Sequence, residues 1–165
     1  MTDHGVRPLL VFAWGNPSRG DDALGPALLE LLACRQEKGD FSNVELLTDF
    51  QLQVEHALDL QGRQRVLFID ASVSAQAPCA LSALQPERDT SYTTHAMSPA
   101  AVLAVYEQIN AEAPPPAFML SIRGYEFELG QSLTPQACVN LQDAFPIACE
   151  FLQGECNPTF SRSTR

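Results

Sequence analysis

Two carboxylates and one imidazole stand where a chain of alternating strands and helices would bring them together. Asp22 follows the apolar run of residues 8–14 across a polar loop. Asp70 ends a second apolar run, 66–69, and His95 stands just before a segment typical of a helix start. In open α/β sheets, ligands bind in the crevice outside the carboxyl ends of the strands. Two carboxylates and an imidazole converging there would suit a borderline divalent cation such as nickel or zinc.

Each of these side chains also has an ordinary structural interpretation. Asp22, with its neighbour Asp21, would stabilise the dipole of the helix that starts there, by about 0.3–1 kcal/mol per residue. Asp70 alone is typical of a turn, and His95 alone is typical of a surface loop. The hypothesis of a joint site therefore depends on the placement of all three at strand ends.

The loop at residues 15–25, Gly-Asn-Pro-Ser-Arg-Gly-Asp-Asp-Ala-Leu-Gly, is rich in glycine but does not fit a phosphate-binding loop. Its spacing matches neither G-x-G-x-x-G nor the Walker pattern. Phosphate loops present backbone N–H groups and a helix N-terminus to an anion, whereas here two aspartates would repel it. A nucleotide-binding role is therefore not expected.

The elements that must position these residues follow from the apolar periodicity. Expected strands cover 9–14, 43–48, 65–70, 80–84 and 117–122, and expected helices cover 22–36, 51–60, 98–110 and 135–153. The continuous apolar run at 9–14 indicates a central strand that is buried on both faces. Proline and polar residues around 80–84 place that strand near an edge. The alternation predicts an α/β fold: a three-layer α/β/α sandwich with a mostly parallel, twisted sheet of about five strands.

The composition indicates one ordinary globular domain with an acidic surface. The chain has 165 residues, with 20 acidic against 10 basic side chains and a formal net charge of −10. We expect a single domain over 1–153 and a flexible tail over 154–165. Neither nucleic acid nor an anionic membrane is an expected partner, because both would be repelled. No apolar run reaches the ~18 residues that span a bilayer, and no signal-peptide pattern is present, so a cytoplasmic location is expected.

The sequence contains five cysteines: Cys34, Cys79, Cys138, Cys149 and Cys156. An odd count without a C-x-x-C pair predicts reduced thiols rather than a disulfide framework or a zinc ribbon. Those at 34, 138 and 149 fall in expected helices, where a small buried apolar side chain is the simpler interpretation. His56 has no second histidine four residues on, so it is expected on a helix surface and not in a zinc protease motif.

Four segments in this order resemble the [NiFe]-hydrogenase maturation endopeptidases. Residues 15–25 are similar to the family's G-N-x-hydrophobic-x-x-D-(D/E)-x-x-G, and residues 124–135 are similar to its G-x(5)-G-x-x-L-(S/T)-P. Asp22, Asp70 and His95 match the family's nickel-facing residues. The resemblance covers about residues 8–150.

The resemblance implies an aspartyl-type endopeptidase that removes the C-terminal extension of a nickel-loaded hydrogenase large-subunit precursor. Asp22, Asp70 and His95 would then engage the precursor's nickel, and no organic cofactor is implied. Either a carboxylate or a metal-bound water could activate the attacking water. Two alternatives stay open: a nickel-binding chaperone that docks on the precursor without cutting it, and a stand-alone metallohydrolase with its own zinc.

Two departures from the family pattern concern substrate choice. Ser18 replaces the usual hydrophobic residue, and the family's D-x-G-T-x-G segment is replaced by residues 49–55, Asp-Phe-Gln-Leu-Gln-Val-Glu. Because that segment is associated with substrate recognition, the resemblance implies that Asp49, Gln51 and Gln53 contact the precursor. The replacement is similar to proteases that serve cytoplasmic, bidirectional NAD(P)-linked hydrogenases. The alternative is that Gln51 merely begins a helix and Gln53 faces water.

Overall fold

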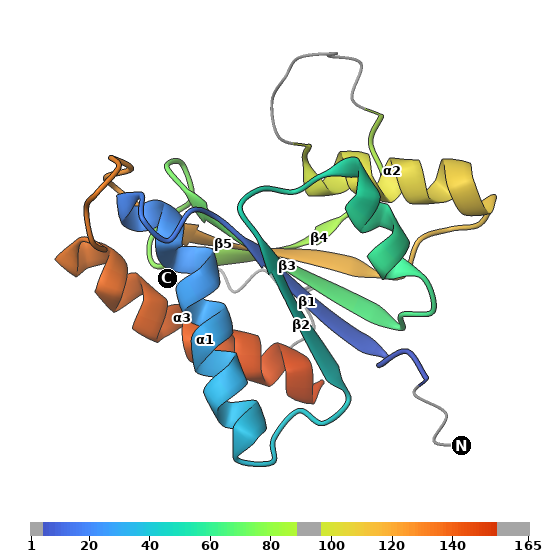
Figure 1. The fold of residues 1–165 in the computed structure, drawn as a ribbon, viewed down its shortest axis with the longest axis horizontal. Coiled ribbons are helices and arrows are strands. Elements are labelled where there is room, and N and C mark those ends of the chain that lie inside the picture. Colours follow the sequence, from blue (N-terminus) through green and yellow to red (C-terminus); the bar gives the residue numbers. More distant parts are fainter. Residues whose placement is uncertain (1–4, 89–96, 155–165) are drawn as a thin grey trace, which may run out of the picture.

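Residues 5–88 and 97–154 are described by a computed structural model of the protein, in which a sheet lies between two helical layers (Figure 1). The strands are β1 (Leu9–Trp14), β2 (Val44–Asp49), β3 (Arg65–Ser72), β4 (Cys79–Leu84) and β5 (Ala117–Arg123). The helices are α1 (Leu24–Glu37), α2 (Pro99–Asn110) and α3 (Pro135–Gln153), with 3₁₀ segments η1 (Gly20–Ala23) and η2 (Val54–Leu60). His95 and Cys156 lie outside the described residues, as does the expected tail beyond residue 154.

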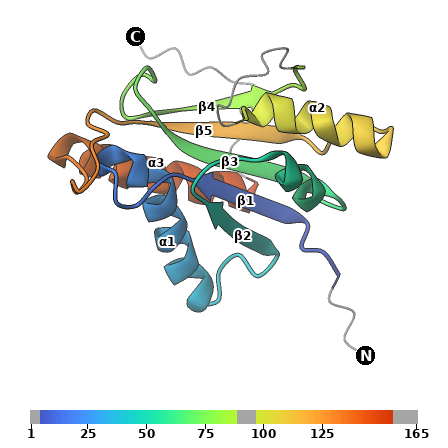
Figure 2. The ribbon, with the colours of Figure 1, turned by 45° about the horizontal axis from the view of Figure 1, so that its top comes forward.

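The five strands form one sheet in the order β2-β1-β3-β5-β4. All neighbours are parallel except β4, which runs antiparallel to β5 at the edge of the sheet. The helices α1 and α3 cover one face, and η2 and α2 cover the other (Figure 2). The expected three-layer α/β/α architecture, with a central apolar first strand and an edge strand near residues 80–84, is therefore confirmed.

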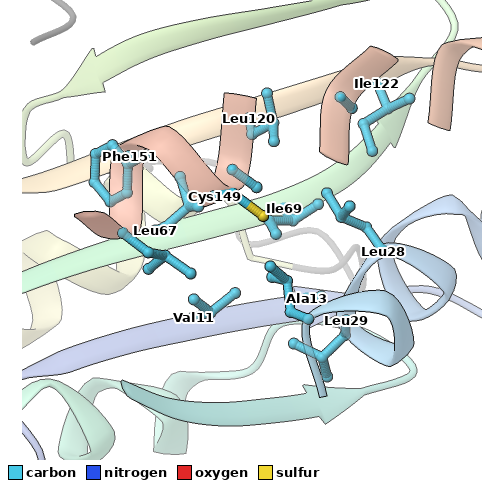
Figure 3. Close-up of a cluster of buried hydrophobic side chains, with 14 of the residues drawn as sticks. Val11, Ala13, Leu28, Leu29, Leu67, Ile69, Leu120, Ile122, Cys149 and Phe151 are labelled. Carbon is cyan, nitrogen blue, oxygen red and sulfur yellow. The ribbon is translucent and has the colours of Figure 1, made fainter. Parts of the chain in front are cut away.

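The two faces of the sheet build two apolar cores, because side chains alternate along each strand. On one face, Val11 and Ala13 of β1 pack with Leu28 of α1 and Phe151 of α3 (Figure 3). On the other face, the alternate residues of β1 pack against η2 and α2, with Phe12 at the centre. A sheet covered on both faces holds the carboxyl ends of its strands rigidly, which is what a site at that edge requires.

Two expected helices differ from the structure. The segment 20–23 forms a 3₁₀ turn, so the first α-helix begins at Leu24 rather than at Asp22. The expected helix at 51–60 is the 3₁₀ segment η2, which begins only at Val54. Its buried residues Ala57 and Leu60 are three apart, a spacing that places them on the same face of a 3₁₀ helix.

The four described cysteines are free thiols. Cys149 is buried in the core, as predicted, whereas Cys79 and Cys138 are half-buried. The prediction that Cys34 is a buried apolar residue was wrong, because Cys34 lies off the buried stripe of α1 and is exposed. Among the described helices, none combines the length and the apolar character needed to cross a membrane.

Candidate functional site at the carboxyl ends of the strands

Asp22 is held over the end of β1 by a tight glycine-dependent loop. Its Oδ2 accepts a hydrogen bond from the backbone N–H of Asn16 at 2.7 Å. Gly15 adopts a positive φ of 144°, and a Cβ there would collide with the backbone oxygen of Asp22. Only glycine therefore allows the loop to fold back on itself. The Asp22 side chain is left half-buried at the edge of the sheet.

The start of α1 rests directly on the ends of two strands. A Cβ on Gly25 would lie 2.6 Å from the backbone oxygen of Trp14 and 3.1 Å from that of Ile69. This contact brings the segment that carries Asp22 to the end of β3, where Asp70 follows Ile69. The two carboxylates are close enough for the charge of Asp22 to contribute to the raised pKa of Asp70.

The environment of Asp70 favours its protonated form. The pKa of this carboxyl is raised to about 7, mainly by burial, with a contribution from the negative charge of Asp22. Hydrogen bonds from the Ala71 backbone N–H, 2.8 Å from Oδ1, and from the Trp14 side chain lower the pKa but do not offset the burial. Two carboxyl groups that share a half-buried site cannot both ionise freely. Such a pair can exchange a proton near neutral pH, or bind a divalent cation that neutralises both charges.

His95, the third residue of the predicted site, lies outside the described residues. The described chain resumes at Met97, whose backbone N–H donates to the backbone oxygen of Leu52 at 3.3 Å. Ser98 then caps α2 by accepting the N–H of Ala101 at 3.1 Å. The structure thus brings Asp22 and Asp70 together. Within residues 5–88 and 97–154, no group of three or more histidine, cysteine or acidic side chains could hold a metal ion.

Asp21 has a role different from that of its neighbour, which the sequence analysis did not distinguish. Its side chain is completely buried. It accepts hydrogen bonds from the backbone N–H groups of Tyr125 (2.8 Å), Glu126 (3.1 Å) and Thr134 (2.7 Å), and from Thr134 Oγ1 (2.8 Å). Burial acts to raise the pKa of Asp21, but these four hydrogen bonds more than compensate and the pKa is lowered. Asp21 therefore fastens the loop between β5 and α3 to the start of α1.

Replacing Asp21 with asparagine should destabilise the protein markedly. At least one of the four donors would then face an amide NH₂ and stay unpaired, at a cost of about 1–3 kcal/mol. We expect the free energy of unfolding, measured by urea denaturation at pH 7, to fall by about 2 kcal/mol or more. Asp22→Asn is the matched control, because its half-buried side chain has one described hydrogen bond, and it should cost less than about 1 kcal/mol. Equal losses in the two variants would contradict the structural role of Asp21.

A cavity of about 290 Å³ opens beside the Asp22 loop. It is lined by Gly15, Pro17, Thr48, Asp49 and Phe50, at the ends of β1 and β2. The backbone N–H of Gly15 donates to the oxygen of Asp49 at 3.1 Å, so the two walls of the cavity are joined. Phe50 is 67% exposed, which leaves an apolar ring at its rim.

The segment 49–55 contributes Asp49 and Phe50 to the lining of this cavity. Asp49 is the last residue of β2, and Gln51 and Gln53 are both exposed. Gln51 precedes η2, so the alternative in which it begins a helix was wrong, whereas Gln53 does face solvent. His56 is not a simple surface residue, as its ring packs on Phe12 with centroids 4.4 Å apart.

Comparison with solved structures identifies the fold. The hydrogenase maturating endopeptidase HybD from E. coli superposes with a TM-score of 0.66 and 24% identity, covering 88% of this chain and 92% of that one. The [NiFe] hydrogenase maturation protease HycI from Thermococcus kodakarensis has a TM-score of 0.63 and 16% identity, over 92% and 95% of the two chains. The hydrogenase 2 maturation peptidase from Thaumarchaeota archaeon SCGC_AB-539-E09 has a TM-score of 0.62 and 18% identity, over 87% and 97%.

The likeness extends over nearly the whole length of both chains in each pair. No protein-family model matches the sequence, and no curated protein matches it. The chain thus shares the five-stranded, mostly parallel α/β fold of the hydrogenase maturation endopeptidases, as expected from the sequence.

Proposed function

We propose that the protein is an endopeptidase that removes the C-terminal extension from the nickel-loaded large-subunit precursor of a [NiFe] hydrogenase. The observation that carries this proposal is the carboxylate pair of Asp22 and Asp70, in which the pKa of Asp70 is raised to about 7. Structures with this fold include several hydrogenase maturation proteases. A fold alone does not define an activity, whereas a paired acid and base at the ligand-binding edge of the sheet is chemistry that peptide hydrolysis needs.

In this proposal the nickel belongs to the substrate. Asp22, Asp70 and His95 approach the precursor's nickel, whose other positions are filled by the precursor's own thiolates. A carboxyl with a pKa near 7 can accept a proton from the attacking water at neutral pH and return it to the leaving amine. We assign this proton transfer to Asp70 and the fixed negative charge to Asp22, with no organic cofactor. The acidic surface and the free described thiols are compatible with a cytoplasmic protein that acts on a protein partner.

The experiment that tests the proposal is direct. Purified protein is mixed with nickel-loaded precursor and with the same precursor free of nickel, and the products are weighed by mass spectrometry. We expect a shortened product from the nickel-loaded precursor alone. Binding without a shortened product would support the chaperone alternative. Cleavage of both precursors, by protein that retains a metal when purified without nickel, would support the stand-alone metallohydrolase.

We further assign precursor recognition to Asp49, Gln51 and Gln53, in the branch of the family that serves bidirectional NAD(P)-linked hydrogenases. Asp49 lines the cavity beside the Asp22 loop. The exposed amides of Gln51 and Gln53 offer donors and acceptors that can pair with an extended peptide backbone.

Replacing Gln51 and Gln53 together with alanine should weaken precursor processing without unfolding the protein. Loss of two hydrogen bonds of about 0.5–1.5 kcal/mol each corresponds to a fall in kcat/KM of about tenfold. The measurement is the rate of appearance of processed subunit at low precursor concentration. Gln142→Ala is the matched control, because this glutamine is exposed on α3, which covers the opposite face of the sheet. A double variant that processes its precursor as fast as the control would show that these amides do not select the substrate.

A further inference from the structure

The imidazole of His56 contacts two residues of the segment 49–55, Gln53 through Nδ1 and Asp49 through Nε2. The backbone N–H of Gln53 donates to Nδ1 at 2.8 Å, so Nδ1 is the nitrogen without a proton. In a neutral imidazole the other nitrogen then carries the proton. That nitrogen, Nε2, faces the Asp49 carboxylate, with 3.3 Å between Nε2 and Oδ2. The contacts therefore select one tautomer of His56.

The ring that makes these contacts has little freedom to move. It packs on Phe12, a buried residue of β1, and only 15% of the His56 side chain is exposed. Because the contact to Gln53 fixes one side of the ring and Phe12 supports its plane, the direction of the Nε2–H bond is determined by the fold. A histidine held in this way can orient a neighbouring carboxylate, as histidines and carboxylates orient one another in many functional sites.

Among the described residues, the Asp49 carboxylate has two partners. Oδ1 accepts the backbone N–H of Phe50 at 2.7 Å, and Oδ2 faces His56. A carboxylate offers about four acceptor positions, so residues 5–88 and 97–154 leave two of them for a ligand. The side chain is 37% exposed and lines the cavity beside Gly15.

We propose that His56 is a positioning residue that aims the Asp49 carboxylate into this cavity for the N–H groups of a bound peptide. The inference rests on the proposed function, since the peptide would be the C-terminal region of the precursor. His56 itself touches no reacting atom. It acts on affinity for the precursor, and the proton transfer stays with the Asp22 and Asp70 pair.

Two substitutions separate the two contacts of the imidazole. In His56→Asn the side-chain oxygen occupies the position of Nδ1, so it keeps the bond from Gln53 but cannot reach Asp49. In His56→Gln the amide NH₂ reaches the position of Nε2 and can donate to Asp49, whereas the bond from Gln53 is lost. A purely structural role predicts that asparagine is the better replacement, and a positioning role predicts that glutamine is.

We expect His56→Asn to raise both the KM for cleavage and the Kd for nickel-loaded precursor about tenfold, which corresponds to about 1.4 kcal/mol, with kcat retained. His56→Gln should stay within about threefold of the natural protein in both constants. Thermal unfolding of each variant checks that the fold is intact. The proposal would be overturned if His56→Asn kept the KM and Kd of the natural protein, or if both variants raised these constants equally.

The tautomer is tested in the free protein, without any substrate. Nitrogen-15 NMR, at a pH where the imidazole is uncharged, should show an unprotonated Nδ1 and a protonated Nε2 for His56, with the Nε2 signal shifted by Asp49→Asn. A protonated Nδ1 would refute the positioning role whether or not the precursor is cleaved. The protein could instead show the expected tautomer and the expected order of Kd values without ever shortening its precursor. That outcome would refute the proposed protease function and leave the positioning role of His56 intact.

Discussion

Asp22→Ala should abolish removal of the C-terminal extension from the precursor. The substitution removes one of the two carboxylates at the end of the sheet, and with it the fixed negative charge that faces the nickel in the proposed function. Loss of a positioned acid–base or metal-facing group costs about 10²–10⁴ in rate. We expect the rate constant for processing to fall by about 10³ or more, measured by intact-mass time courses at saturating precursor.

The protein should stay folded in this variant, because Asp22 is half-buried and its described hydrogen bond is the single one from Asn16. Glu30→Ala serves as the matched control, since Glu30 is an exposed carboxylate on α1 that follows the same turn. It should process the precursor at the normal rate. An Asp22→Ala protein that keeps more than about a tenth of the natural rate would exclude an essential role for this carboxylate.

The strands could be predicted closely from the sequence because they are buried. The run 9–14 is apolar at every position, as expected for a parallel strand covered on both faces, and β1 has those bounds. The strand predicted at 65–70 was two residues too short. Ala71 and Ser72 extend β3 because they pair with Ile122 and Arg123 of β5. The apolar pattern of the local sequence identifies a buried strand, but the residue at which the strand ends depends on the neighbouring strand that pairs with it.

The parts of the site that escaped prediction depend on contacts between distant residues. Asp21 and Asp22 are adjacent, yet only the partners of Asp21 at Tyr125 and Thr134 make it structural, and these are more than a hundred positions away. The side chain of His56 accepts the backbone N–H of Gln53 at the start of η2, a capping contact that the sequence analysis did not anticipate. Sequence reasoning placed Asp22 and Asp70 at the same edge, but it could not give the burial that perturbs Asp70.

Burial of Asp70 implies that this site lowers the stability of the protein at the pH where it would work. The pKa of Asp70 is raised from 3.8 to about 7 in the folded state. Between these values the folded protein keeps a proton that the unfolded chain has released. The free energy of unfolding therefore falls as the pH rises from about 4 to about 7, by on the order of 3 kcal/mol for this one group.

Asp70→Asn should remove this penalty, because asparagine does not ionise. We expect the variant to be more stable than the natural protein at pH 8, by about 2–3 kcal/mol, and the difference to shrink towards zero near pH 4. Urea denaturation at several pH values between 4 and 8 gives both profiles. The same substitution should abolish precursor processing, so stability and activity would change in opposite directions, as is common where a strained site serves a function. Parallel stability profiles for the two proteins would show that Asp70 is not the group that titrates near pH 7, and would remove the assignment of proton transfer to its carboxyl.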